Sequence, residues 1–101
     1  MFEIDGLALP RAAATVDVVG RDTATSLVRA SIPALEAWNA DKGTYVGATI
    51  AKLKRIYDQG LDATRTTIVR ATKTTYCIQA TVNGATAKKN GPAAPIALGR
   101  C

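Results

Sequence analysis

The two cysteines carry the chemistry that is easiest to name in this chain. Cys77 lies within a strand-like run rich in Thr, Ile, Val and Tyr, and Cys101 is at the last of the 101 positions. A disulfide between them closes a loop of 25 residues, both cysteines included, and in the chain-entropy description such a loop contributes about 3–4 kcal/mol. We expect this bond and an oxidising compartment. The alternative is two unrelated free thiols in a cytosolic protein.

Catalytic chemistry has few groups to use here. The chain contains no histidine, which removes the commonest general base and the commonest metal ligand. Asp58 and Asp62 flank Gly60, but two carboxylates fall short of the six or more oxygen ligands that calcium takes. We therefore expect no catalytic, cofactor or metal site, and a protein that is not an enzyme.

The basic residues offer a binding chemistry instead. Thirteen Lys and Arg against eight Asp and Glu give a net charge of +5 and a pI near 9.6, which favours DNA or another anionic polymer as partner. The candidate contacts lie on a predicted helix and on or beside predicted strands: Lys52, Lys54, Arg55, Arg70, Lys73, Lys88 and Lys89. The alternative is an ordinary solvated surface. Strand register decides whether Arg70 and Lys88 share a face, and the sequence does not fix that register.

The first element that must position these groups is a helix. Residues 1–21 show no clear apolar pattern and are interpreted as a flexible or weakly helical leader. The sequence does not show whether this leader is native. From Asp22, a plausible N-cap, apolar residues recur at helical spacing as far as Trp38, which we expect in the core. Pro33 predicts a kink or the loss of a backbone hydrogen bond near Arg29, and Gly43 suits the left-handed conformation that ends a helix. A second, short helix is predicted over residues 48–58.

Strands follow. Residues 66–72, 75–82 and 85–90 are predicted to form an antiparallel meander, and Asn83-Gly84 is a strong signal for a type I′ hairpin turn. Residues 91–101 are expected to form an irregular tail that returns to Cys77. The predicted fold class is α+β: an N-terminal helix packed on an antiparallel sheet of three or slightly more strands, with a short second helix and a disulfide-closed C-terminal loop.

Several segments, taken in order, resemble the type IV pilins and pseudopilins of bacteria. Residues 34–45 (ALEAWNADKGTY) resemble the point where the alanine-rich pilin helix enters an Asp-x-Gly-x-Tyr-type segment, and residues 46–53 (VGATIAKL) resemble the short second helix. The strand at 75–80, the Asn83-Gly84 turn, the KKNGP stretch at 88–92 and the terminal Cys101 are similar to the end of many pilin-like headpieces. The resemblance covers residues 22–101, which we interpret as one globular headpiece.

One hallmark of that family is missing from residues 1–20. They contain neither the prepilin peptidase site nor the apolar helix half that anchors a pilin in the membrane and packs the filament core. The chain therefore resembles a soluble truncation, or a split pilin whose hydrophobic N-terminal helix is a separate polypeptide. No stretch of this chain is apolar enough to span a membrane.

The resemblance implies a structural role. We expect the extracytoplasmic headpiece of a type IV pilus or pseudopilus filament, exposed at the cell surface and held in the inner membrane before assembly if the native protein has a hydrophobic helix. Its partners would be other pilin subunits or a separate helix subunit. The alternative function is a minor pilin or secreted module that captures DNA or another anionic polymer. Motility, adhesion, DNA uptake and secretion all stay open as the biological role.

Overall fold

The computed structural model describes the backbone of residues 4–101 and the side chains from Val19 onward. A single long helix, α1 (Ile4–Lys42), is followed by the short helix α2 (Ile50–Ile56). Four strands complete the fold: β1 (Thr66–Ala71), β2 (Tyr76–Val82), β3 (Ala85–Asn90) and β4 (Ile96–Leu98). They form one antiparallel sheet in the order β1-β2-β3-β4. The predicted α+β class, with helix, short helix and antiparallel sheet, is confirmed.

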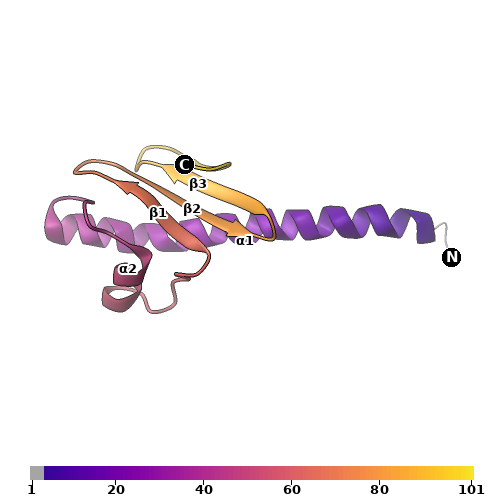
Figure 1. Cartoon of the computed structure of the whole chain (residues 1–101), viewed down its shortest axis with the longest axis horizontal. Helices are drawn as coiled ribbons and strands as arrows, with labels where there is room; N and C mark the ends of the chain where they lie inside the picture. The colour runs from indigo at the N-terminus through magenta and orange to yellow at the C-terminus, as the bar shows by residue number, and fades with distance from the viewer. Residues whose placement is uncertain (1–3) are drawn as a thin grey trace.

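The sheet packs against the C-terminal part of α1, and the N-terminal part of the helix backbone continues past the sheet (Figure 1). At 1.5 Å of rise per residue, the 39 residues of α1 span about 58 Å, which accounts for the 60 Å long axis of the molecule. The side chains that α1 buries include Ala24, Val28, Leu35 and Trp38. Their spacing of four, seven and three residues places them on one face of the helix. The prediction that Trp38 belongs to the core is confirmed.

Close contact between α1 and the sheet depends on small side chains. A Cβ added at Gly20 would lie 2.9 Å from the carbonyl oxygen of Val82, so only glycine lets the helix approach the β2–β3 hairpin this closely. That hairpin turns at Asn83 and Gly84, whose φ angles are +52° and +81°. Positive φ at both central residues defines the predicted type I′ turn.

Several expected element boundaries differ from the structure. Asp22 lies inside α1 and is not its N-cap, and α1 continues through Pro33, which lies on the exposed side of the helix. The predicted end at Gly43 is confirmed: its φ is +72°, and its N–H donates to the carbonyl of Asn39 over 2.7 Å. The division into a leader at 1–21 and a headpiece at 22–101 stays a prediction. Residues 1–3 lie outside the described part of the chain, and α1 runs across residue 21.

The C-terminal tail is more regular than its sequence indicates. Residues 96–98 form β4, which pairs with β3 through Ala87↔Leu98, Lys88↔Ala97 and Lys89↔Ile96. The irregular tail predicted for residues 91–101 is therefore wrong over these three positions. Such a short strand, directly after Pro95 and before Gly99, has too few residues to show an alternating pattern. Its pairing with β3 is a tertiary effect.

Candidate functional site

The disulfide ties the end of the chain to the outer face of the sheet, the face turned away from α1. Cys77 on β2 and Cys101 are bonded, with their Cα atoms 5.8 Å apart, as predicted. Cys77 is fully buried, whereas Cys101 is exposed. Because β3 lies between β2 and β4, the chain must cross the outer face of β3 to reach Cys77. The bond therefore fastens a strap, residues 99–101, over the sheet.

Few other interactions hold the tail. The N–H of Gly99 donates to the carbonyl of Thr86 over 2.8 Å, and the N–H of Cys101 donates to Oε1 of Gln79 over 2.9 Å. The ammonium of Lys89 donates to the carbonyls of Pro92 and Ala94. Apolar packing adds little, because Ile96 is the tail residue packed against the core and Leu98 is 54% exposed.

The register divides the predicted basic residues of the sheet between its two faces. Lys88 pairs with Gln79 and Arg70 pairs with Cys77, so Arg70 and Lys88 both lie on the outer face. A register shift between Ile68 and Arg70 gives Arg70 this orientation, because a bulge changes the alternation of side chains along a strand. Lys89 pairs with the buried Ile78 and therefore lies on the face that α1 covers.

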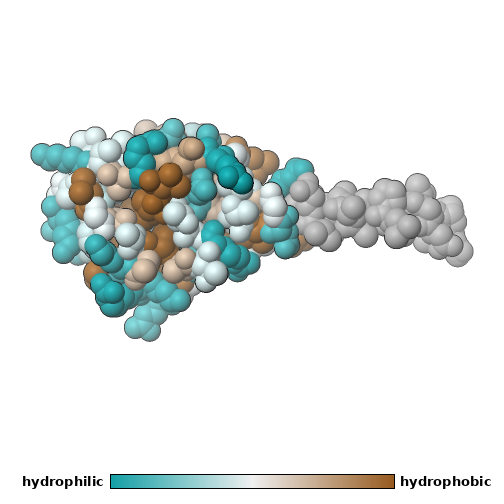
Figure 2. Space-filling view, viewed as in Figure 1, coloured by the Kyte–Doolittle hydropathy of each residue, from teal (hydrophilic) through white to brown (hydrophobic). Residues whose placement is uncertain are grey.

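A second group of cations gathers at the end of the body where α1 finishes, which we call the distal end. Lys42 and Lys52 lie against the ring of Trp38, with their ammonium nitrogens 5.1 and 5.8 Å from its centroid. The loop from β1 to β2 carries Lys73 and lies beside them, because the N–H of Tyr45 donates to the carbonyl of Thr72 over 3.1 Å. Figure 2 shows hydrophilic side chains projecting at this end of the molecule.

Positive charge dominates the part of the chain whose side chains are described. Residues 19–101 contain twelve Lys and Arg against five Asp and Glu. Within those residues no carboxylate lies within ion-pair distance of the three distal lysines, Lys42, Lys52 and Lys73. Unneutralised cations at one end of a small body raise the local concentration of anions there. The distal end is therefore the candidate binding surface.

Other cations that are predicted as anion contacts lie on α2 or donate hydrogen bonds within the protein. Lys54 and Arg55 are exposed in the last turn of α2. Arg70 donates from Nη2 to Oδ1 of Asn90 over 2.8 Å. Lys42, which sequence reasoning missed, occupies the last turn of α1. Its position four residues after Trp38 is the signal that places the two side chains together.

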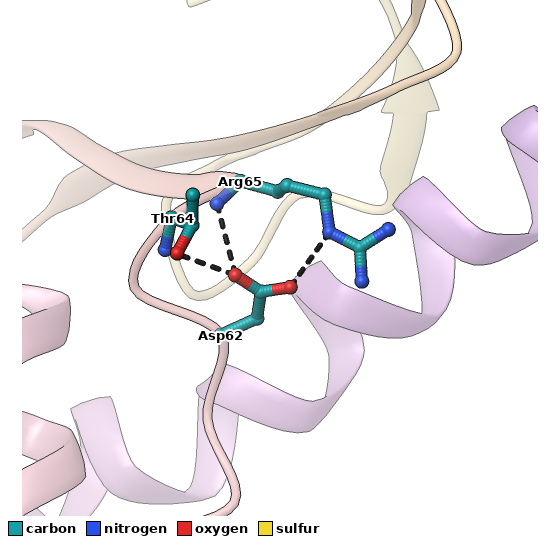
Figure 3. Close-up of polar contacts among 3 residues, drawn as sticks. All are labelled: Asp62, Thr64 and Arg65. Carbon is teal, nitrogen blue, oxygen red and sulfur yellow. Dashed lines mark hydrogen bonds and ion pairs between the residues drawn. The ribbon is translucent and has the colours of Figure 1, made fainter.

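Three of the carboxylates are bound to neighbouring side chains. Glu36 accepts a hydrogen bond from Tyr45 over 2.9 Å, and Asp41 accepts one from Tyr57. Asp62 accepts from the backbone N–H groups of Thr64 and Arg65 and, over 2.7 Å, from Nε of Arg65 (Figure 3). The backbone N–H of Arg65, followed by its side chain, lowers the pKa of Asp62. These hydrogen bonds to Asp62 hold the backbone of residues 62–65, directly before β1.

Two tyrosines join α1 to the sheet. Tyr45 and Tyr76 are buried and meet edge to face, with ring centroids 4.9 Å apart. Burial, reinforced by the hydrogen bond to Glu36, raises the pKa of Tyr45 to about 12. Burial also raises the pKa of Tyr76, with the Glu36 charge adding to the effect. Both phenols therefore favour the neutral form, which makes this contact sensitive to alkaline pH.

We predict that stability falls as the pH rises from about 10, where Tyr45 ionises in the unfolded chain, to about 12, where it ionises in the folded protein. The raised pKa of Tyr45 contributes stability below pH 10, and that contribution is lost through this window. The loss attributable to Tyr45 is on the order of 2 kcal/mol. Urea titrations between pH 8 and pH 12 measure it. Tyr45→Phe should flatten the pH dependence; an unchanged slope in this variant would assign the effect to other groups.

No protein-family model, no curated protein and no solved structure matches this chain. No helix within the described residues is both long enough and apolar enough to cross a membrane. The function must therefore be inferred from three features of the structure. The helix α1 extends past the sheet, residues 99–101 cross the outer face of the sheet, and lysines gather at the distal end.

Proposed function

We propose that this chain is the headpiece of a type IV pilus or pseudopilus subunit, a structural protein outside the cytoplasm. The observation that carries the proposal is the length of α1 relative to the body it supports. Its C-terminal part buries one face against the sheet, and its backbone continues past the sheet toward Ile4. A helix that leaves its own domain in this way can pack alongside the same helix of neighbouring subunits, or against a separate hydrophobic helix polypeptide.

Two further features support this role. The Cys77–Cys101 bond suits a domain that works in an oxidising space outside the cytoplasm. The order of elements, from long helix through short helix to antiparallel meander and disulfide-fastened end, agrees with the sequence resemblance to pilin headpieces. In this proposal α1 makes the contacts between subunits, and the sheet with residues 99–101 forms the surface exposed on the filament.

Filament incorporation tests the proposal. An antibody against the body should decorate filaments regularly in the sheared surface fraction of the producing cells, as seen by electron microscopy. Val19 is 51% exposed on α1 near the edge of the body, and Val46 is 54% exposed at the distal end. Val19→Asp should lower the amount of chain in sheared filaments several-fold, because it places a charge on the assembly helix. Val46→Asp is the matched control and should leave incorporation unchanged.

Two outcomes would contradict the proposal. Filaments that carry no label, with all signal in the envelope or medium, would exclude a structural filament subunit. Equal loss of incorporation in the two valine variants, with both chains folded by circular dichroism, would show that α1 is not the assembly element.

A second function, capture of an anionic polymer such as DNA, is favoured by one observation. Lys42, Lys52 and Lys73 gather at the distal end without a carboxylate partner among the described side chains. In a filament built on α1, this end is the one farthest from the projecting helix. Phosphate groups bound there would release counterions, so the affinity would fall steeply with salt.

Paired substitutions test that second function. Lys42→Gln with Lys73→Gln should weaken binding to a DNA duplex at low salt by about tenfold and reduce the salt slope by about two. Arg29→Gln with Arg100→Gln removes the same charge away from the distal end and should change the affinity much less. Fluorescence anisotropy over a salt series measures both quantities. Equal weakening in the two double variants would indicate a non-localised charge effect and would contradict a distal site.

A further inference from the structure

The C-terminal tail is attached in a way that permits its transfer to another molecule. Of residues 92–101, Ile96 alone packs against the core, and most of the tail is exposed. Its hold on the body consists of three ladder positions, a few hydrogen bonds and the bond from Cys101 to the buried Cys77. These partners are supplied by β2 and β3, α1 also contacts β4, and all of them are the same in every copy of the chain.

The connection before β4 is suited to opening. Residues 91–95 turn from β3 into β4, with the N–H of Ala94 donating to the carbonyl of Gly91 over a long 3.3 Å. Gly91 and Ala94 each precede a proline, and a residue before proline favours an extended backbone. An extended crossover through this connection is therefore compatible with the preference of the residues before the two prolines. The crossover gives up the turn hydrogen bond from Ala94 to Gly91 and the two hydrogen bonds that Lys89 donates to Pro92 and Ala94.

We propose that a second copy of this chain is the partner of the β3 edge, through reciprocal exchange of residues 91–101. In the exchanged pair, β4 of each copy pairs with β3 of the other, and Cys101 of each copy is bonded to Cys77 of the other. The strand pairs, hydrogen bonds and disulfide of residues 96–101 are remade between the two chains. Exchange of a terminal element is a low-cost route to a dimer because it requires no new interface.

The exchange needs a thiol as a catalyst and no oxidant. A thiolate attacks the sulfur of Cys101, which is the exposed residue of the pair, forms a mixed disulfide there and releases Cys77 as a thiolate. The Cys77 thiolate of one copy then attacks the Cys101 mixed disulfide of the other copy and expels the small thiolate. The reciprocal step gives the second bond. Two intrachain disulfides become two interchain disulfides, and both small thiolates are regenerated.

Local concentration decides which form prevails. The exchanged dimer and the closed monomer share the contacts of residues 96–101, so the balance depends chiefly on the effective concentration of a chain's own tail, which is in the millimolar range for a short connection. Dilute protein should stay monomeric. Copies held side by side, as in a filament, would exchange far more readily and become covalently linked along their outer faces. The exchange itself does not require that the chain forms filaments.

Isotope mixing tests the proposal with the full-length chain. Unlabelled and ¹⁵N-labelled protein are mixed at about 1 mM and at about 10 µM, concentrations that bracket the effective concentration of the tail. Both samples contain catalytic reduced glutathione and are then quenched with N-ethylmaleimide. At the higher concentration we expect a disulfide-linked dimer on non-reducing gels with a native far-ultraviolet spectrum. Mass spectrometry should find a disulfide-linked pair of peptides, in which the Cys77 peptide comes from a chain of one isotope and the Cys101 peptide from a chain of the other. The dimer fraction should fall at least tenfold on dilution.

Two variants test the roles of the Cys101 sulfur and of the two prolines in the connection. Cys101→Ser should give no such dimer, because it keeps Cys77 but lacks the transferable sulfur. Pro92→Ala with Pro95→Ala should lower the dimer fraction several-fold, since the connection loses its extended preference, while the monomer keeps its fold. Absence of the mixed-isotope peptide at the higher concentration, or linkage only between two Cys101 sulfurs, would overturn the proposal.

Discussion

The covalent link between Cys77 and Cys101 is the constraint on which the C-terminal tail, residues 91–101, depends. Cys77 is buried in the second strand of the sheet and Cys101 ends the chain, so the bond brings the tail back across β3. Without it, three paired residues, a few hydrogen bonds and one partly buried isoleucine would have to hold the whole tail. An isolated strand of three residues gains too little from pairing to offset the loss of backbone freedom.

The rest of the body is organised by one face of α1. The helix buries a line of residues at three- and four-residue spacing against β2 and β3, and Gly20 allows it to approach the hairpin closely. This contact leaves the other face of the sheet for the strap and for Arg70 and Lys88. Assembly through the helix and recognition through the sheet or the distal end can therefore operate on separate surfaces, as the proposed filament role requires.

Local signals predicted the parts of the fold that depend on neighbouring residues. The β2–β3 turn follows from Asn83-Gly84, the end of α1 from Gly43, and the core position of Trp38 from helical spacing. The disulfide was predictable because the chain has two cysteines, one of them in a strand-like run. The start of α1 was not, because residues before Asp22 lack a clear apolar period and a long helix is stabilised by packing more than by propensity.

The candidate site was harder to predict because it depends on pairing between distant segments. Lys88 and Lys89 are adjacent in sequence, yet the pleat sends them to opposite faces. The register shift between Ile68 and Arg70 brings Arg70 to the outer face. No glycine or proline in this part of β1 marks the shift in the sequence. The distal lysines meet through the contact between Tyr45 and Thr72, a tertiary contact with no local sequence pattern.

The disulfide, and not packing, holds the tail to the body. Hydrogen exchange measured amide by amide on the oxidised and the reduced protein tests it most directly. On reduction, the amides of Gly99 and Cys101, which donate to Thr86 and Gln79, should lose their protection, while those of β2 and α1 keep theirs. Equal protection of the Gly99 amide in both states would contradict the claim and would show that β4 pairs stably without the bond.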